Sequence, residues 1–303
     1  MAARPHVAGL PPRPRLAPRP GGGLVAYAPA KINLNLLVGP RRADGYHPID
    51  SLVAKVTLYD RLELRSRTDG RVVFSCSGAD CGPDERNLAL RAWRAVAEAC
   101  GDGRGVRIDL RKGIPPGAGL GGGSSDAAAV LWAANRLLGE PLTAGALLAL
   151  AASLGSDVPL FLGTPASRIA GRGERIAPIR VSPFLAVLIL PEFDCSTAAV
   201  YRVFDEAPTR LRRQLKPSVL PGSPSAWRGL LRNDLAAAAR KVSEPLAALW
   251  DSLSAAVHLP VFLTGSGSGL FILCDGPAEA SAVLAELPRN LPCRRIVVRA
   301  NPW

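Results

Sequence analysis

The sequence predicts an α+β fold divided into two domains. The chain has 303 residues, which is long enough for two domains of ordinary size. Predicted strands and helices follow each other irregularly rather than in strict alternation, which favours α+β layers over a parallel βαβ sheet. A glycine-rich loop at residues 117–123 also joins a strand pattern to a helix pattern. Such a unit is suited to hold an anion, because backbone N–H groups of the loop and helix point at one place.

The first half of the chain opens with a strand pattern over residues 25–38. Apolar residues there alternate with Lys31, Asn33 and Asn35, and this period of two predicts that the three polar side chains share one face. Lys31 and Asn33 would then project in the same direction, about 7 Å apart. Further strands are predicted over 52–59, 61–66 and 71–76, helices over 87–100 and 143–154, and a hairpin over 165–180.

The loop before the second predicted helix has the sequence PPGAGLGGGSSD at residues 115–126. Its glycines remove Cβ atoms, so the backbone can approach a phosphate closely. Ser124, Ser125 and Asp126 are all good N-cap residues, which predicts that the helix begins there. We therefore expect a serine hydroxyl at the start of the helix, within reach of a phosphate or Mg²⁺.

Three other interpretations of this loop are weaker. The P-loop pattern requires a Gly-Lys-Ser/Thr ending, and no lysine occurs here. Gly117, Gly119 and Gly122 match the dinucleotide fingerprint by letter, but a helix pattern over 143–154 stands where that fold needs a second strand. A flexible linker is disfavoured because linkers rarely lie between a strand and a capped apolar helix.

The second half of the chain combines short strands with helices. A glycine loop at 265–269 separates two short strand patterns, at 261–264 and 270–273. Segment 206–225 is rich in proline, serine and arginine, and we predict a long loop there. The other predicted elements are a strand over 183–190, helices over 228–240, 244–256 and 277–287, and a strand over 294–299.

The formal net charge is +12, and part of it lies in a proline- and arginine-rich tail at residues 1–23, which we predict to be disordered. No RNA motif or zinc finger accompanies the charge, so we expect a solvated surface that favours anionic small molecules, and no nucleic-acid partner. No apolar run is long enough to span a membrane, and no membrane partner is expected. The cysteines show no Cys-x-x-Cys spacing, and we therefore predict free thiols and a reducing cytoplasm.

Two charged residues in apolar surroundings are candidates for chemistry. Lys31 lies inside an apolar strand pattern, where a lysine needs a partner, unless it protects a sheet edge from aggregation. Asp157 stands between a helix end and an apolar run, either as an N-cap before Pro159 or as a carboxylate held near phosphates. We expect the ammonium of Lys31 to face the carboxylate of Asp157 and a substrate oxygen.

Three segments resemble the signature motifs of the GHMP small-molecule kinases: PAKINL at 29–34, the loop at 115–126 and TGSG at 264–267. They occur in the order that the family has and span most of the chain. The segment RADGYH at 42–47, together with LGSDVP at 154–159, resembles the branch of the family that acts on a cytidylylated methylerythritol in the non-mevalonate isoprenoid pathway.

The resemblance implies a GHMP kinase fold of two α+β domains with ATP and the small-molecule substrate between them. An N-terminal two-layer α/β domain is expected over 24–180 and a C-terminal ferredoxin-like α+β domain over 181–303. The implied activity is transfer of the γ-phosphoryl group of ATP, with Mg²⁺, to the 2-hydroxyl of the methylerythritol. Lys31 and Asp157 match the catalytic pair: Asp157 would accept or orient the hydroxyl proton, and Lys31 would keep Asp157 ionised.

The resemblance also implies binding residues. Tyr46 would stack on the cytosine ring and His47 would hydrogen-bond its edge, although the preceding Asp-Gly pair also fits a plain turn. Further substrate contacts are implied for Asn33, Thr197, Tyr201, Gly265, Ser266 and Gly267. The implied ATP loop comprises Pro115, Pro116, Gly117, Ala118, Gly119, Leu120, Gly121, Gly122, Gly123, Ser124 and Ser125.

Rival functions remain open at the level of sequence. Another GHMP kinase, such as a homoserine or mevalonate-pathway kinase, is disfavoured by the segment 42–47, because those substrates carry no base to stack. A catalytically dead nucleotide-binding regulator is disfavoured by the presence of both Lys31 and Asp157. A dinucleotide-dependent oxidoreductase is a more distant alternative.

Overall fold

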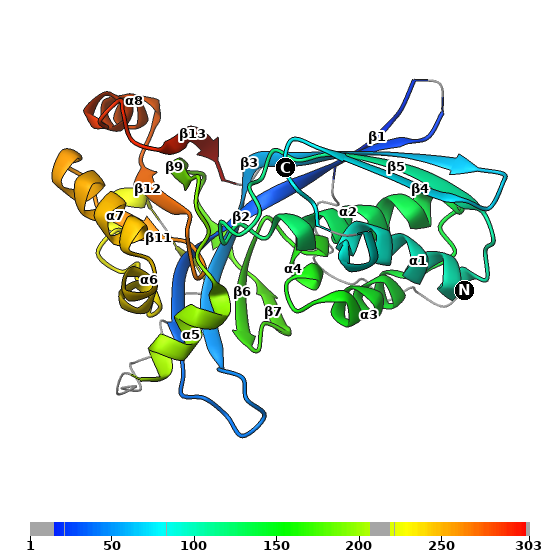
Figure 1. Cartoon of the computed structure of the whole chain (residues 1–303), viewed down its shortest axis with the longest axis horizontal. Coiled ribbons are helices and arrows are strands. Elements are labelled where there is room, and N and C mark those ends of the chain that lie inside the picture. The colour runs from blue at the N-terminus through cyan, green and yellow to red at the C-terminus, as the bar shows by residue number, and fades with distance from the viewer. Residues whose placement is uncertain (1–14, 21, 83, 207–218, 221, 301–303) are drawn as a thin grey trace.

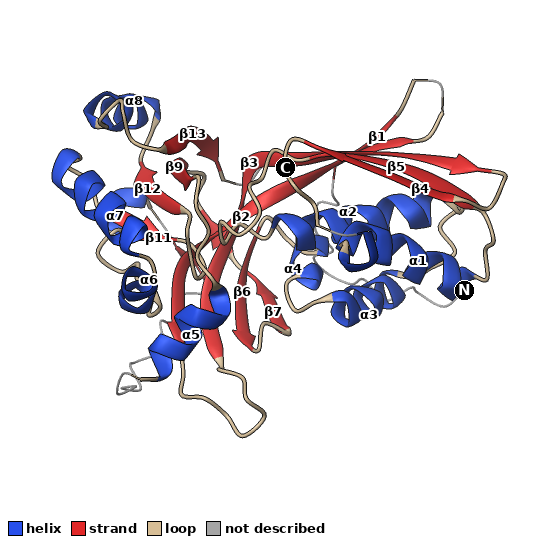
Figure 2. Ribbon diagram, viewed as in Figure 1, coloured by secondary structure: helices blue, strands red, loops and turns tan. Residues whose placement is uncertain are grey.

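The structure is a computed structural model that describes residues 15–20, 22–82, 84–206, 219–220 and 222–300. Its mixed helices and strands confirm the predicted α+β class, with one large sheet and its helices in each half of the chain (Figures 1 and 2). A short parallel pairing also joins β8 (Arg180–Val181) to β10 (Val219–Leu220).

In the described part of the chain the first sheet has seven strands. Its path is β1-β2-β3-β5-β4, while β6 pairs with β3, and β7 pairs with β6. All pairs are antiparallel except β4 with β5. The strands are β1 (Arg15–Pro18), β2 (Leu24–Val38), β3 (Ile49–Arg67), β4 (Val72–Ser77), β5 (Gly105–Arg111), β6 (Ala166–Gly171) and β7 (Arg175–Pro178).

β2 confirms the strand predicted at 25–38, whereas β3 is one long strand where the sequence predicts two. The β2–β3 pairing shifts register between Pro29 and Ala30, and β3 absorbs the shift as a bulge without ending. Both strands run from one half of the molecule into the other (Figure 1). Residues from both halves, including Ile32, Phe184 and Phe271, pack around them in one shared core.

Helices α1 to α4 cover one face of the first sheet (Figure 2). Asn87 caps α1 by accepting a hydrogen bond from the N–H of Ala89, and Gly101 ends α1 at φ 62°, as the sequence predicts. Trp93 of α1 is buried in the core between the helices and the sheet. The helices are α1 (Leu88–Cys100), α2 (Gly122–Leu137), α3 (Ala144–Leu154) and α4 (Val158–Leu162), with a 3₁₀ turn η1 (Asp84–Arg86) before α1.

The second sheet is antiparallel, with the order β11-β12-β9-β13. Alternate residues of β9 face different cores: Leu188 packs in the core shared with β2, whereas Ile189 packs among residues of the C-terminal helices. The elements are β9 (Leu185–Pro191), α5 (Thr197–Asp205), η2 (Pro224–Ala226), α6 (Ala236–Val242), α7 (Glu244–Ala256), β11 (Val261–Leu263), β12 (Leu270–Cys274), α8 (Pro277–Glu286) and β13 (Cys293–Arg299). No helix in the described residues is long and apolar enough to cross a membrane.

α6 begins at Ala236, so the helix predicted over 228–240 was wrong in its N-terminal part. The residues before α6 lie along the end of β2 instead. The N–H of Leu36 donates to the carbonyl of Arg232, and the N–H of Asp234 donates to the carbonyl of Leu36, both at 2.8 Å. Pairing with a strand from the other half of the chain has therefore overridden the local helical pattern.

The predicted disordered tail at 1–23 lies partly outside the described residues. Residues 15–18 form β1 and pair with β2, so the prediction of disorder was wrong for this segment. The predicted loop at 206–225 also lies largely outside the described residues, although β10 and η2 fall within it. The predicted domain boundary between residues 180 and 181 falls inside β8 and stays a prediction.

The cysteines depart in one place from the predicted free thiols. Cys76, in β4, and Cys81, in the turn after it, form a disulfide with their Cα atoms 6.5 Å apart. The turn after β4 brings the two residues together, which the spacing in the sequence did not indicate. The cysteines described as free thiols are Cys100, Cys195, Cys274 and Cys293.

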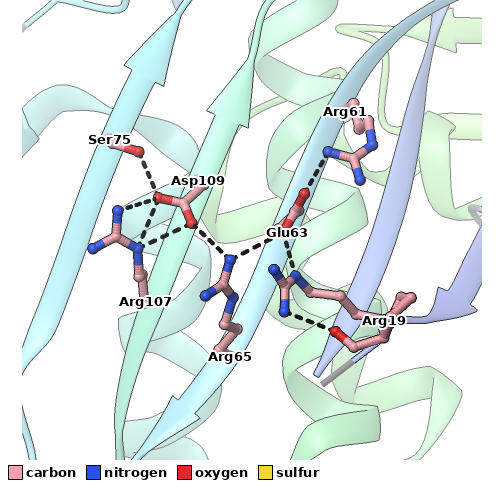
Figure 3. A network of polar contacts seen from close by, with 8 residues as sticks. Arg19, Arg61, Glu63, Arg65, Ser75, Arg107 and Asp109 are labelled. Carbon is pink, nitrogen blue, oxygen red and sulfur yellow. Dashed lines mark hydrogen bonds and ion pairs between the residues drawn. The ribbon is translucent and has the colours of Figure 1, made fainter. Parts of the chain in front are cut away.

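A network of charged side chains covers the face of the first sheet that the helices leave open (Figure 3). Hydrogen bonds from Arg19 and Arg61 lower the pKa of Glu63 to about 2. Arg65 contacts both Glu63 and Asp109, and so connects β3 to β5. Much of the basic charge on this face is thus paired with carboxylates, as expected of a solvated surface.

Candidate active site

The glycine-rich loop joins β5 to α2, as the sequence predicts, but α2 begins earlier than predicted. Gly121, with φ 71°, occupies the N-cap position, so the predicted caps at Ser124, Ser125 and Asp126 were wrong. Glycine adopts this left-handed conformation readily, whereas it is unfavourable for other residues. The turn therefore starts α2 at Gly122, and both serines lie inside its first turn.

The loop is clamped between the two halves of the molecule. A Cβ atom on Gly119 would lie 2.4 Å from the carbonyl oxygen of Thr264, and one on Gly121 would lie 2.8 Å from Cζ of Phe161. The N–H of Lys31 also donates to the carbonyl of Leu120 at 3.0 Å. These contacts hold the loop against the third motif, α4 and β2 at once.

A cavity of about 490 Å³ lies along the loop, and residues 115–124 all line it. Ser125 does not, although the sequence places it in the ATP loop. Its side chain is buried, and its hydroxyl donates to the carbonyl of Pro29 at 2.7 Å. The structure therefore leaves Ser124, and not Ser125, at the wall of this cavity.

Sequence reasoning missed a buried charge cluster at this cavity, which Lys112 and Asp126 help to line. Lys112 forms ion pairs with Asp60 and Asp126, and all three side chains are buried. Burial acts to lower the pKa of Lys112, but the charges of Asp126 and Asp60 outweigh it and raise that pKa. Asp60 also accepts hydrogen bonds from the N–H groups of Gly113 and Ile114, which anchors the start of the loop. In the sequence, the only hint of this cluster was Asp60, a charged residue within a largely apolar strand pattern.

A second cavity, of about 680 Å³, adjoins the first, because Gly119 and Gly121 line both. It brings together residues that are widely separated in the sequence. The predicted site residues that line it are Lys31, Asn33, Tyr46, His47, Asp157, Thr197, Tyr201, Gly265 and Ser266. Gly267 does not line it, and a Cβ atom at this position would lie 3.4 Å from both Cβ of Cys195 and Cδ1 of Leu263.

Lys31 and Asp157 both line this cavity, and the side chain of Lys31 lies beside Gly121, one of the shared glycines. Lys31 is only 6% exposed, and its backbone N–H is covered by the glycine loop, which argues against a solvent-exposed edge lysine. Its ammonium donates to Oδ1 of Asn33. Burial lowers the pKa of Lys31, while the charge of Asp157 acts in the opposite direction. Asp157 occupies the N-cap position of α4, but its carboxylate makes no capping hydrogen bond. That carboxylate is therefore available to a ligand.

Asn33 is fixed from both sides. Its backbone N–H donates to Oγ1 of Thr264 at 3.0 Å, and its side-chain amide donates to Oγ of Ser51 at 2.8 Å. Across the cavity, Thr197 and Ser266 share a hydrogen bond of 2.7 Å between their hydroxyls. The wall is therefore polar and rigid where the first and third motifs meet.

Aromatic side chains also line this cavity. Tyr46 is 52% exposed, and the guanidinium of Arg172 lies 3.6 Å from its ring centroid, so one face is covered and the rest is accessible. The rings of His47 and Tyr201 lie 5.2 Å apart between centroids. Tyr201 therefore reaches the same aromatic group from α5.

His47 departs from its predicted role in one respect. Its Nδ1 lies 2.9 Å from the carbonyl of Gly39, and its Nε2 lies 3.1 Å from Oδ1 of Asp205. Both ring nitrogens already have partners, so each can hydrogen-bond to a base edge only if its present contact breaks. Asp205, at the end of α5, and Arg172 are cavity residues that sequence reasoning missed, since each lies in a different part of the chain from the motifs.

Family comparisons agree with this arrangement. The description GHMP kinases N terminal domain matches residues 87–163, and GHMP kinases C terminal matches residues 215–293, together more than half of the chain. The fold and the site define the class, and the chain belongs to the GHMP kinases.

Within this class the chain is similar to proteins named 4-diphosphocytidyl-2-C-methyl-D-erythritol kinase. One from Polaromonas sp. is 40% identical over 84% of this chain and 85% of its own length. Another, from Symbiobacterium thermophilum, is 40% identical over 89% of this chain and 97% of its own length. A crystal structure of a 4-(cytidine 5'-diphospho)-2C-methyl-D-erythritol kinase has a TM-score of 0.72 and 33% identity, and covers 92% of this chain and 100% of the other.

Proposed function

We propose that this protein transfers the γ-phosphoryl group of ATP to the 2-hydroxyl of 4-diphosphocytidyl-2-C-methyl-D-erythritol, in the non-mevalonate isoprenoid pathway. The observation that carries the proposal is the pair of adjoining cavities that share Gly119 and Gly121. One, the nucleotide cavity along the glycine loop, is lined by backbone suited to phosphates. The other, the substrate cavity, is lined by Lys31 and Asp157 together with the rings of Tyr46, His47 and Tyr201. The names of the similar proteins supply the substrate.

Asp157 is the residue that accepts or orients the hydroxyl proton, since its carboxylate is not used in capping α4. Lys31 keeps that carboxylate ionised and offsets charge that develops on the transferred group. Asn33 holds the ammonium of Lys31 in place. Such a small group of residues is sufficient because phosphoryl transfer depends mainly on positioning and electrostatic stabilisation.

ATP fits the nucleotide cavity through the N–H groups of the loop and the start of α2. Mg²⁺ bound together with ATP would offset the negative charge of the phosphates. Such an ion takes few ligands from the protein. The described residues contain no cluster of three or more metal-binding side chains. The oxygen donors that line the cavity include the hydroxyl of Ser124 and Oδ1 of Asp126, which is buried without a hydrogen-bond partner.

We further propose that the substrates are the only partners that the activity needs and that the protein works in the cytoplasm, where its cosubstrate ATP is available. The paired charges on the open sheet face support a solvated surface rather than a nucleic-acid site (Figure 3).

The test of this function is ADP formation with and without the cytidylylated methylerythritol. We expect ADP and a singly phosphorylated product, identified by mass, only when both substrates are present. Homoserine and mevalonate serve as comparison substrates, and a preference for either would identify a different GHMP kinase activity. Nucleotide binding without turnover on any of the three would support a dead regulator.

Tyr46→Ala is expected to raise the KM for the cytidylyl substrate by about 5- to 150-fold, because stacking a base on an aromatic ring contributes about 1–3 kcal/mol. The KM for ATP should change less than about twofold, since Tyr46 does not line the nucleotide cavity. Tyr46→Phe is the matched control and should retain the affinity. Equal losses for both substrates would contradict the stacking role.

A further inference from the structure

Two lysines on neighbouring strands lie on the side of the first sheet that carries α4. Lys31 of β2 and Lys55 of β3 stand directly opposite each other in the antiparallel register, so their side chains leave the sheet on the same face. Lys31 interacts electrostatically with Asp157, the N-cap residue of α4. Lys55 instead reaches the last turn of α4. The short helix that follows Asp157 is therefore hydrogen-bonded at its C-terminal end by the lysine that stands opposite Lys31 in the sheet.

Lys55 binds the C-terminal end of α4 through its side chain and its backbone. Its Nζ donates to the carbonyl oxygens of Phe161, at 3.3 Å, and of Gly163, at 2.5 Å. Its N–H donates to the carbonyl of Pro165 at 2.8 Å. The last carbonyls of a helix lack partners within the helix, and this end attracts a cation. A helix of five residues is too short to be stable alone, so these contacts fix where it lies.

A cation at this depth is unfavourable for folding. Lys55 is 1% exposed, and burial lowers its pKa to about 7. An apolar side chain of similar length would avoid the desolvation of a charge. Both the ammonium and the neutral amine carry N–H donors, so the contacts to α4 persist in either state. Positioning of α4 explains a lysine here better than stability does.

We propose that Lys55 is a positioning residue for phosphoryl transfer, which holds α4 so that Asp157 faces the substrate hydroxyl beside Lys31. The proposal rests on the proposed function, because it takes Asp157 as the residue that accepts or orients the hydroxyl proton. Lys55 itself lines neither cavity. We infer that its effect on the site is transmitted through α4.

The test compares Lys55→Met, which removes the N–H donors, with Lys55→Gln, which keeps an uncharged donor. A misplacement of about 1 Å at a reacting group can cost about 100-fold in rate. We therefore expect Lys55→Met to lower kcat by about 10- to 100-fold, with the KM for each substrate within about twofold. Lys55→Gln should recover part of this loss. The midpoint temperature of thermal unfolding should stay close to that of the unsubstituted chain in both variants. Lys241→Met, at an exposed site, is the control and should change neither kcat nor this temperature.

Each outcome bears on the proposal. Unchanged kcat in a folded Lys55→Met variant would overturn it, as would parallel losses of kcat, both affinities and thermal stability in Lys55→Met and Lys55→Gln. Activity of the unsubstituted chain is measured first with the cytidylylated methylerythritol. Failure of the proposed function appears in that first assay, whereas failure of the Lys55 proposal appears only in the comparison of variants.

Discussion

Asp157→Asn is expected to lower kcat by about 10²- to 10⁴-fold, the range that a positioned proton acceptor contributes. The amide keeps the shape of the side chain but cannot take up the hydroxyl proton or carry the negative charge that faces Lys31. The KM for ATP should stay within about twofold, because Asp157 lines the substrate cavity and not the nucleotide cavity. Steady-state ADP formation and equilibrium nucleotide binding separate the two effects.

Asp251→Asn is the matched control for this substitution. Asp251 lies in α7 and pairs with Arg240 at the surface, so the same chemical change there should leave kcat unaltered. Turnover by Asp157→Asn within tenfold of the unsubstituted chain would show that another group handles the proton. Loss of nucleotide binding together with turnover would instead indicate that the variant disturbs the glycine loop, which contacts α4 through Phe161.

Local sequence patterns predicted the parts of the site that lie within one element. The alternation in residues 25–38 placed Lys31 and Asn33 on one face of β2, and both line the substrate cavity. The spacing of glycines before an apolar helix predicted the strand–loop–helix unit along the nucleotide cavity. Period and turn chemistry are local properties, so a single sequence carries them.

The remaining parts depend on contacts between distant segments. Lys55 fell within a predicted strand with no indication that its side chain reaches a helix more than 100 residues later. Asp205 contacts His47 across an even longer separation. The helix start was misplaced for a different reason: Gly121 adopts a left-handed conformation under the packing of Phe161, and N-cap preferences alone favoured the serines. Tertiary packing decided these positions.

Gly119→Ala is expected to weaken the binding of both substrates and to destabilise the fold, because the two cavities of the site meet at this residue. A Cβ atom would stand 2.4 Å from the carbonyl oxygen of Thr264 and 3.2 Å from that of Gly267. The backbone has φ 71°, and a left-handed conformation costs a residue other than glycine about 1–2 kcal/mol. The loop can relieve the clash only by moving away from the third motif, which also threatens the hydrogen bond between Gly269 and Ala118.

The expected result is a loss of at least about 2 kcal/mol in the free energy of unfolding, in line with other strained backbone sites. The KM for ATP and for the cytidylyl substrate should each rise more than about tenfold, since Gly119 lines both cavities. Urea unfolding and steady-state kinetics measure the two effects. Gly145→Ala provides the control: Gly145 is exposed near the start of α3 with no close contact, and alanine there should stabilise the helix by up to about 1 kcal/mol. A Gly119→Ala variant with unchanged stability and affinities would mean that the loop does not need its close approach to Thr264, and that the two cavities are not coupled through this residue.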